Sequence, residues 1–144
     1  MKFGGTSVMD SKAVERLVKI VSTSSSQKTV VVVSALAGVT DSLIKIARLA
    51  SGGQAEEALS LTASLEERHL GMAEELLSGN EALLKEAAEA IKQLFAKMNE
   101  IVRVISVLEE LSDMSMAKIL SFGEILSSSI IHKAMLKSGL RCAF

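Results

Sequence analysis

A lysine, two glycines and two hydroxyl side chains open the 144-residue chain, in the order Lys2, Gly4, Gly5, Thr6, Ser7. Adjacent glycines let backbone N–H groups come close to a ligand. The lysine adds a mobile positive charge, and the hydroxyl groups add hydrogen-bond donors. This combination suits a polyphosphate, although the lysine precedes the glycines and the motif is therefore not the common P-loop. A plain strand-to-helix turn that uses the glycines only for its geometry explains the same residues.

A second cluster of small and hydroxyl residues spans 34–41, with the sequence Ser34-Ala35-Leu36-Ala37-Gly38-Val39-Thr40-Asp41. It follows an apolar segment that we expect to be a strand. Ligands of open α/β sheets bind at the carboxyl ends of the strands, where Ser34 and Thr40 would offer hydroxyl groups. Taken alone, the cluster is better explained as a helix start, with Gly38 in a turn and Thr40 or Asp41 as the N-cap.

A third cluster, Ser121-Phe122-Gly123-Glu124, lies inside a predicted helix. Glycine in a helix interior costs roughly 1 kcal/mol relative to alanine, which indicates that another segment approaches Gly123 closely. Glu124 would need a cationic partner if it lay at the edge of the core. A solvent-exposed glutamate beside a glycine used for helix packing remains an equal alternative.

The first fifty residues follow the order of an α/β protein. We expect a strand ending at Phe3, a helix from about Asp10, a strand over Thr29–Val33 and a helix from Thr40 or Asp41 to Ala50. Thr29–Val33 is β-branched and apolar on both faces, as in a central strand that is covered on both sides. The positive end of the first helix would also favour an anion beside the glycines.

The rest of the chain is predicted to be helical. Periodic apolar residues indicate helices over about 55–77, 81–108 and 115–137, and an apolar stripe with spacings of three and four runs from Leu84 to Leu108. The segment Leu140–Phe144 resembles the beginning of another strand, so the sheet would be incomplete.

Composition excludes several classes of function. A net charge of −1 and only 3% aromatic residues argue against a nucleic-acid partner. No uninterrupted apolar run reaches the roughly 18 residues that span a bilayer, so we expect no membrane partner. The single cysteine, Cys142, fits a reducing cytoplasm and is expected in a buried strand. His69 and His132 lack metal-ligand spacing and are expected in packing or surface positions, and no metal site is assigned.

The three clusters together resemble the motifs of aspartate kinases, within the amino acid kinase superfamily. Lys2-Phe3-Gly4-Gly5-Thr6-Ser7-Val8 is similar to the first motif of that family, residues 33–40 to the second and residues 121–124 to the third. The resemblance implies an α/β fold, a three-layer αβα sandwich, of which the chain is an incomplete N-terminal portion with a large helical insert. It implies that residues 1–144 are part of a single catalytic domain, which lacks its C-terminal remainder, a few residues before Met1 and any regulatory domain.

The resemblance also implies a reaction. An aspartate kinase uses ATP with Mg²⁺ to phosphorylate the side-chain carboxylate of L-aspartate, giving 4-phospho-L-aspartate, the entry to lysine, threonine and methionine biosynthesis. Lys2 would be the catalytic residue that neutralises phosphate oxygens. Thr40 would help to hold aspartate, and Glu124 would pair with its ammonium group. The residues that would bind the ATP phosphates are Lys2, Gly4, Gly5, Thr6, Ser7 and Ser34. Because later motifs of the family have no counterpart, we expect the chain alone to be inactive.

Two other interpretations remain. The chain could belong to a kinase for another substrate, of the N-acetylglutamate or carbamate type, or it could be a non-catalytic helical interaction module that uses the stripe from Leu84 to Leu108. A homo-oligomer is expected in either kinase case, and a partial sheet with an exposed edge also favours association.

Overall fold

The computed structural model describes residues 1–24 and 28–144. Along the chain these residues form β1 (Lys2–Phe3), the short 3₁₀-helix η1 (Gly5–Val8), α1 (Ser11–Thr23), β2 (Val32–Val33), α2 (Val39–Ser51), α3 (Ala55–Leu77), α4 (Glu81–Leu108) and α5 (Asp113–Lys137). Residues 25–27, which end the polar segment between the first helix and the second strand, lie outside the described residues. The element order confirms the predicted succession of strand, helix, strand and helix, followed by three long helices.

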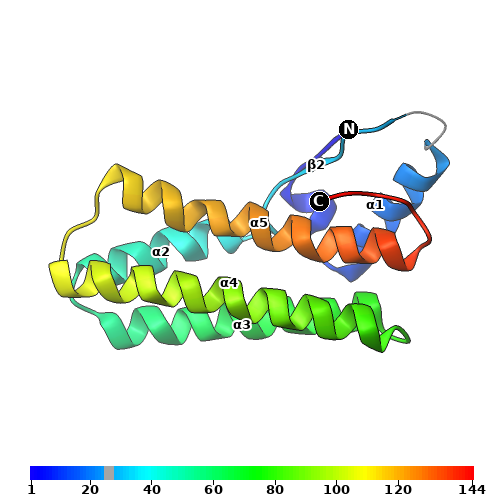
Figure 1. Ribbon diagram of the computed structural model, residues 1–144. Coiled ribbons are helices and arrows are strands. Elements are labelled where there is room, and N and C mark those ends of the chain that lie inside the picture. The colour runs from blue at the N-terminus through cyan, green and yellow to red at the C-terminus, as the bar shows by residue number, and fades with distance from the viewer. Residues whose placement is uncertain (25–27) are drawn as a thin grey trace.

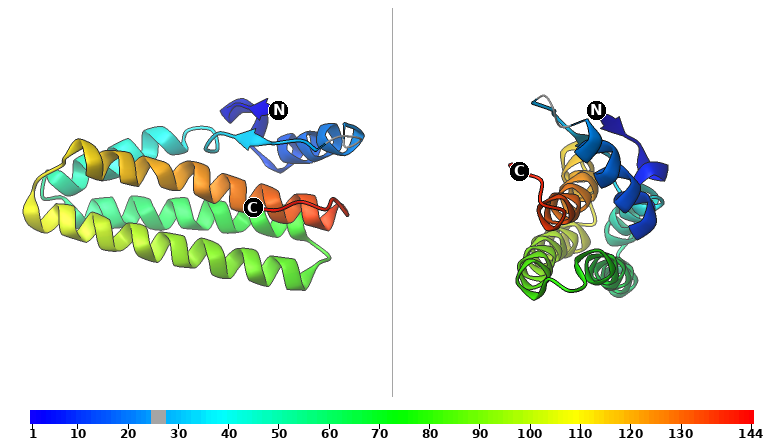
Figure 2. Two further views of the ribbon diagram at one scale, coloured as in Figure 1. Left: turned by 45° about the horizontal axis from the view of Figure 1, so that its top comes forward. Right: turned by 90° about the vertical axis from the view of Figure 1, so that its right-hand side faces the viewer.

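Helices α2 to α5 form an antiparallel bundle in which each helix runs back along the one before it (Figure 1). α2 covers one half of the length of α5, and the strands with α1 lie along the other half (Figure 2). The bounds of α3 and α4 are those predicted from periodicity. The bundle therefore forms a long support, and the two strands lie against one end of it.

Local capping explains where two of the helices begin. The Asp10 carboxylate accepts a hydrogen bond of 2.7 Å from the Ala13 backbone N–H, which makes Asp10 the N-cap of α1. Ser112 caps α5 in the same way, by accepting from the Ser115 N–H at 3.1 Å. α5 therefore starts at Asp113, two residues earlier than the sequence predicts.

The start of α2 differs from the prediction. The helix begins at Val39, and its N-cap is Gly38, which has a φ of 76° and makes no side-chain cap. The predicted cap at Thr40 or Asp41 is therefore wrong, because a left-handed turn that glycine adopts easily starts the helix earlier. Thr40 and Asp41 instead lie exposed in the first turn of the helix.

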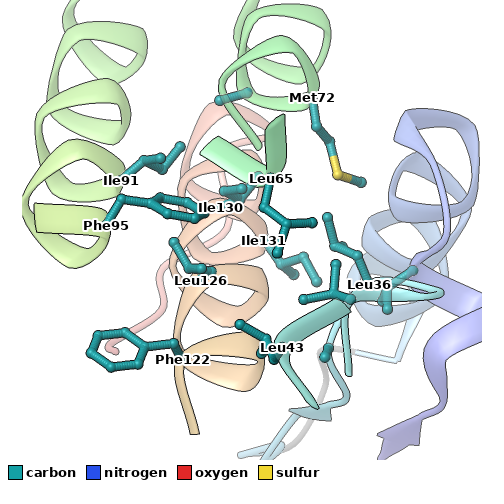
Figure 3. Packing of buried hydrophobic residues seen from close by; sticks show 14 of the residues in the cluster. Leu36, Leu43, Leu65, Met72, Ile91, Phe95, Phe122, Leu126, Ile130 and Ile131 are labelled. Atoms are coloured by element: carbon teal, nitrogen blue, oxygen red, sulfur yellow. The ribbon is translucent and has the colours of Figure 1, made fainter. Parts of the chain in front are cut away.

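Apolar side chains from every helix meet in one core (Figure 3). Within the stripe of α4, Ala87, Ile91, Met98 and Ile105 are buried, whereas Leu108 at its end is exposed. The stripe is thus largely occupied by packing within the chain, which argues against its use as a surface for a separate partner.

His69 of α3 is fully buried in this core. Its Nδ1 lies 2.6 Å from the backbone oxygen of Leu65, and its ring meets the Phe95 ring edge-on at 5.5 Å. A bond to a carbonyl requires Nδ1 to carry the proton, which leaves Nε2 as an acceptor without a partner among the described residues. Burial lowers the pKa of His69 below its ordinary value of 6.5. The expected packing role is confirmed.

His69 should make the chain less stable in mild acid. The unfolded chain binds a proton at His69 as the pH falls through about 6.5, whereas the buried, neutral ring does not. The contribution of neutral His69 to the free energy of unfolding is therefore fully present above pH 6.5. It decreases below that pH by up to about 1.4 kcal/mol for each pH unit, until the lowered pKa of His69 in the folded chain is reached. Urea titrations between pH 7.5 and 5.5 should show this slope, and it should disappear in His69→Leu but persist in His132→Asn. An unchanged slope in His69→Leu would contradict the assignment.

The sheet is smaller and more exposed than predicted. β1 and β2 are parallel, with Lys2 opposite Val32 and Phe3 opposite Val33. The strand predicted over Thr29–Val33 is reduced to two residues because β1 offers only two partners. Val30 and Val32 are 76% and 53% exposed, so the expectation of a strand covered on both faces is wrong for the described sheet.

The predicted third strand over Leu140–Phe144 is not formed in the described chain. The segment turns back onto α5, where the Leu140 N–H donates to the Met135 oxygen at 3.1 Å and the Phe144 ring stacks on His132 at 5.6 Å. The described sheet consists of β1 and β2, and a groove of about 530 Å³ is lined both by this segment and by the residues around β2. Cys142 is accordingly half-buried rather than part of a buried strand.

By length and composition α5 could cross a membrane, because it contains an 18-residue window with a mean hydropathy of 1.2. Within that window 44% of the residues are buried inside the protein. α5 packs against β2 and the other four α-helices, and a central helix of a bundle has the same composition. The feature gives only weak support for a membrane span.

Candidate active site

The first two sequence clusters leave the same edge of the sheet. β1 ends at Phe3 and continues into Gly4, and β2 ends at Val33 and continues into Ser34. The Ser34 N–H donates to the Phe3 oxygen at 3.1 Å, which fixes the start of the second loop beside the first. Since the strands are parallel, both loops emerge at the carboxyl edge, where α/β proteins bind ligands.

The first loop is a tight turn anchored in the core. The Ser7 N–H donates to the Gly4 oxygen at 2.9 Å, and Val8 at the end of η1 is fully buried. A β-carbon placed on Gly5 would lie 3.4 Å from the Ala35 oxygen and 4.0 Å from the Ala37 Cα. The two loops therefore meet at Gly5, and a β-carbon there would be in van der Waals contact with the second loop.

Lys2 extends over the glycine loop. Its side chain is exposed, and its Nζ lies 3.9 Å from the position that a β-carbon on Gly4 would occupy. Within residues 1–24 and 28–144, the recorded ion pair joins Lys133 to Glu86 and does not involve Lys2. The ammonium group is thus available to an anion at the loop.

The predicted contribution of a helix end to this anion site is wrong. α1 does not follow the glycines directly, because η1 separates them and α1 begins only at Ser11. The carboxylate of Asp10 already occupies the N-terminus of α1 and offsets its partial positive charge. Positive potential at the loop therefore depends on Lys2 and on the backbone N–H groups.

The third cluster lies directly behind the second loop. A β-carbon on Gly123 would lie 2.8 Å from the Ala35 Cβ and 3.3 Å from the Leu43 Cδ1, which confirms that the glycine permits a close approach. One turn later, the buried Ser127 hydroxyl donates to the Ser34 oxygen at 2.8 Å. Sequence analysis assigns no role to Ser127, although its position four residues after Gly123 places both residues on one helix face.

Arg68 of α3 supplies a contact that the sequence does not reveal. Its Nη2 donates to the Ala37 oxygen at 2.9 Å, and the side chain is exposed. Arg68 stands between Glu67 and His69, and nothing in this sequence distinguishes it from an arginine whose charge is simply solvated. The structure thus adds Ser127 and Arg68 to the residues that hold the loop over 34–38.

The two residues predicted to contact the amino acid substrate lie at the junction of α2 and α5. Thr40 follows Val39, whose Cγ1 would lie 3.6 Å from a β-carbon on Gly123, and Glu124 follows Gly123. Both side chains are exposed, and no partner is recorded for either among the described residues. Their position beside the second loop suits a ligand at the sheet edge, and the exposure of Glu124 also suits the alternative of a solvated glutamate.

Comparison with known proteins places this arrangement in a family. The model of the amino acid kinase family matches residues 1–144. The chain belongs to the amino acid kinase family. The resemblance that the three motifs indicate is therefore confirmed at the level of the family, and it extends over the helical part of the chain.

Individual members of the amino acid kinase family narrow the similarity to aspartokinases. The chain is 37% identical over 130 residues to an aspartokinase of Chlamydia trachomatis, a match that covers 90% of this chain and 26% of that protein. It is 28% identical over 145 residues to a chloroplastic bifunctional aspartokinase/homoserine dehydrogenase 2 of Zea mays, covering 99% of this chain and 15% of that protein. The chain thus spans about a quarter or less of these relatives.

A solved structure supports the amino acid kinase fold. E. coli aspartokinase III, in complex with aspartate and ADP in its R-state, matches with a TM-score of 0.77 and 26% identity, covering 97% of this chain and 29% of that chain. The predicted α/β class is confirmed in part, since the described residues contain the parallel strand pair and the helices but only two strands.

Proposed function

We propose that the chain provides the phosphate-binding residues, and part of the aspartate-binding residues, of an aspartate kinase. The reaction would transfer the γ-phosphoryl group of ATP to the side-chain carboxylate of L-aspartate and give 4-phospho-L-aspartate. The observation that carries the proposal is the convergence of all three motifs on the loop over 34–38, through Gly5, Ser127 and Gly123. The similar aspartokinase III was solved with aspartate and ADP.

The reaction places modest chemical demands on the protein. A carboxylate is already an ionised nucleophile, so a general base is not required. The difficulty is to bring two anions together, which is solved by positioning and by positive charge. We assign charge neutralisation to Lys2, whose Nζ lies over the glycine loop.

The remaining roles follow from position. The residues proposed to hold the ATP phosphates through N–H and hydroxyl groups are Gly4, Gly5, Thr6, Ser7 and Ser34. Thr40 and Glu124, at the junction of α2 and α5, would take the aspartate, with Glu124 opposite the ammonium group. This pairing with the ammonium group would explain why a carboxylate, that of Glu124, lies in a site that binds anions.

The proposed reaction needs Mg²⁺ together with ATP. Among the residues that the structure describes, no group of three His, Cys, Asp or Glu side chains could hold a metal ion. In the proposed reaction, Mg²⁺ would enter with ATP and be held largely through phosphate oxygens and water, as is usual for this metal.

We further propose that residues 1–144 form the N-terminal part of a single catalytic domain with a three-layer αβα sandwich, and that the chain alone lacks kinase activity. The complete enzyme would be a cytoplasmic homo-oligomer of lysine, threonine and methionine biosynthesis, without nucleic-acid or membrane partners. A coupled assay with ATP and aspartate tests the inactivity, and turnover comparable to that of a complete kinase would overturn it.

Phosphate binding is testable on the chain itself. Lys2→Ala should weaken the affinity for Mg-ATP about tenfold or more, since a hydrogen bond to a charged group contributes about 1.5–3 kcal/mol and 1.4 kcal/mol is a factor of ten. Isothermal titration calorimetry measures this. Lys12→Ala, which removes an exposed charge from α1, is the control and should leave the affinity nearly unchanged. Equal affinities of the wild type and Lys2→Ala would refute the assigned role.

A protection experiment distinguishes an aspartate kinase from a kinase of the N-acetylglutamate type. Aspartate should protect Lys2 from acylating reagents in the presence of Mg-ADP, and N-acetylglutamate should not. The reverse order of protection would favour a kinase of the N-acetylglutamate type.

A further inference from the structure

The loop over 34–38 is held from three sides. β1 holds its first residue, through the bond from the Ser34 N–H to the Phe3 oxygen. α5 holds the same residue from behind, through the bond from the Ser127 hydroxyl to the Ser34 oxygen. At its far end, Arg68 of α3 donates to the Ala37 oxygen, and the Ser42 hydroxyl of α2 donates to the Gly38 oxygen at 3.1 Å.

Ala37 occupies a position where a small displacement matters. Its Cα is 4.0 Å from the place of a β-carbon on Gly5, so a shift of Ala37 changes the contact with the glycine loop. It also precedes Gly38, whose left-handed turn starts α2 and thereby places Thr40. The Val39 N–H closes this turn by donating to the Leu36 oxygen at 3.0 Å.

Arg68 is suited to hold this carbonyl. An arginine donates from a planar group that keeps its charge at all relevant pH values, and charge-assisted bonds are stronger than neutral ones. Although Glu67 adjoins it in sequence, the recorded bond of Arg68 is to a carbonyl 31 residues away. This bond joins the helical bundle to the sheet edge.

We propose that Arg68 is a positioning residue, which holds the Ala37 carbonyl and thereby keeps the second loop in register with the glycine loop and with Thr40. The proposal rests on the function proposed above for the same site. It assigns to α3, a helix that carries none of the three motifs, a direct part in arranging the loops for ATP and aspartate.

The experiment compares Arg68→Ala, Arg68→Lys and Arg103→Ala in the full chain. Arg103 is an exposed arginine of α4 without a recorded partner in the described part of the chain, so its removal controls for the loss of one positive charge. Amide hydrogen exchange at Val39 reports on the turn, with α4 amides as an internal reference, and calorimetry reports on Mg-ATP affinity.

In Arg68→Ala, we expect exchange at Val39 to accelerate while α4 is unchanged, and Mg-ATP affinity to fall by about five- to tenfold, the lower end of typical coupling between sites. Arg68→Lys, which can still donate to the carbonyl, should recover most of both effects, and Arg103→Ala should show neither.

Three results would overturn the proposal. Unchanged exchange at Val39 would show that the bond does not hold the loop, even if affinity falls through loss of charge. Faster exchange with unaltered affinity would show a bond without consequence for the site. If Arg68→Lys is as impaired as Arg68→Ala in both measurements, Arg68 does not act by holding the Ala37 carbonyl. If the wild-type chain binds no Mg-ATP, the proposed function fails for this chain, and the exchange result alone decides whether Arg68 holds the loop.

Discussion

Gly123→Val is expected to lower the free energy of unfolding by about 3 kcal/mol, the upper end of the cost of overpacking a core. The first added carbon would lie 2.8 Å from the Ala35 Cβ, where real β-carbons are essentially never found, and 3.3 Å from Leu43. Ala35 has no flexible end that could move away, so relief requires either α5 or the loop backbone to shift. Urea denaturation monitored by circular dichroism measures the change.

Gly71→Val is the matched control for this substitution. Gly71 also lies inside a long helix, α3, but a β-carbon there meets nothing within 4 Å. Valine and glycine differ by only a few tenths of a kcal/mol in helix propensity, so the stability of this variant should change by less than about 0.5 kcal/mol. Similar losses in both variants would show that the cost comes from the helix and not from contact with the loop.

Gly123→Val should also weaken ligand binding at the candidate site. Because Ala35 contacts both Gly123 and Gly5, displacing it should also loosen the glycine loop, and Mg-ATP affinity should fall in Gly123→Val under conditions where the variant is still folded. Affinity equal to that of Gly71→Val would indicate that α5 moves and the loop does not.

Phe95→Ala should be the most damaging single truncation, with an expected loss of about 3–5 kcal/mol. Phe95 of α4 is fully buried and among the largest side chains of the core, and its ring packs against His69. Removal would leave a cavity between α3 and α4, which are joined at one end by the turn over 78–80.

Phe144→Ala provides the comparison, since Phe144 is 75% exposed and its truncation should cost less than about 0.5 kcal/mol. Both variants can be compared by their urea midpoints. A loss below about 1 kcal/mol in Phe95→Ala would mean that the helices collapse into the space, which the packing around His69 makes unexpected.

Helix positions follow directly from sequence in this chain because periodicity is a local property. α3 and α4 lie where their apolar spacing predicts, and α1 begins at Ser11, next to its predicted start at about Asp10. Strand extent depends instead on a partner that is distant in sequence. The apolar run at Thr29–Val33 resembles a long covered strand, but pairing with Lys2–Phe3 limits it to two residues. The segment Leu140–Phe144 likewise has strand composition without a strand partner.

The candidate site also contains some residues that the sequence reveals and others that only the fold reveals. Its glycine clusters are visible in sequence because glycine inside a helix is costly and two glycines after a strand indicate a turn. Gly5 and Gly123 both lie beside Ala35, and the approach at Gly123 is the closer one. The residues that hold the second loop are not visible. Ser127 and Arg68 are ordinary helix-surface types, and only the fold brings them to Ser34 and Ala37. The chemical roles of the loop residues remain predictions.

The short connections within the bundle imply an order of assembly. α2 to α5 follow one another through turns of three or four residues, so most of their contacts are between neighbours along the chain, which favours rapid folding. The pairing of Lys2 with Val32 must instead close a long loop that contains α1. The bundle is therefore expected to form first and the two strands to dock onto it afterwards. The sheet edge that carries the glycine loop would then also open first, as a unit of lower local stability than the helices that support it.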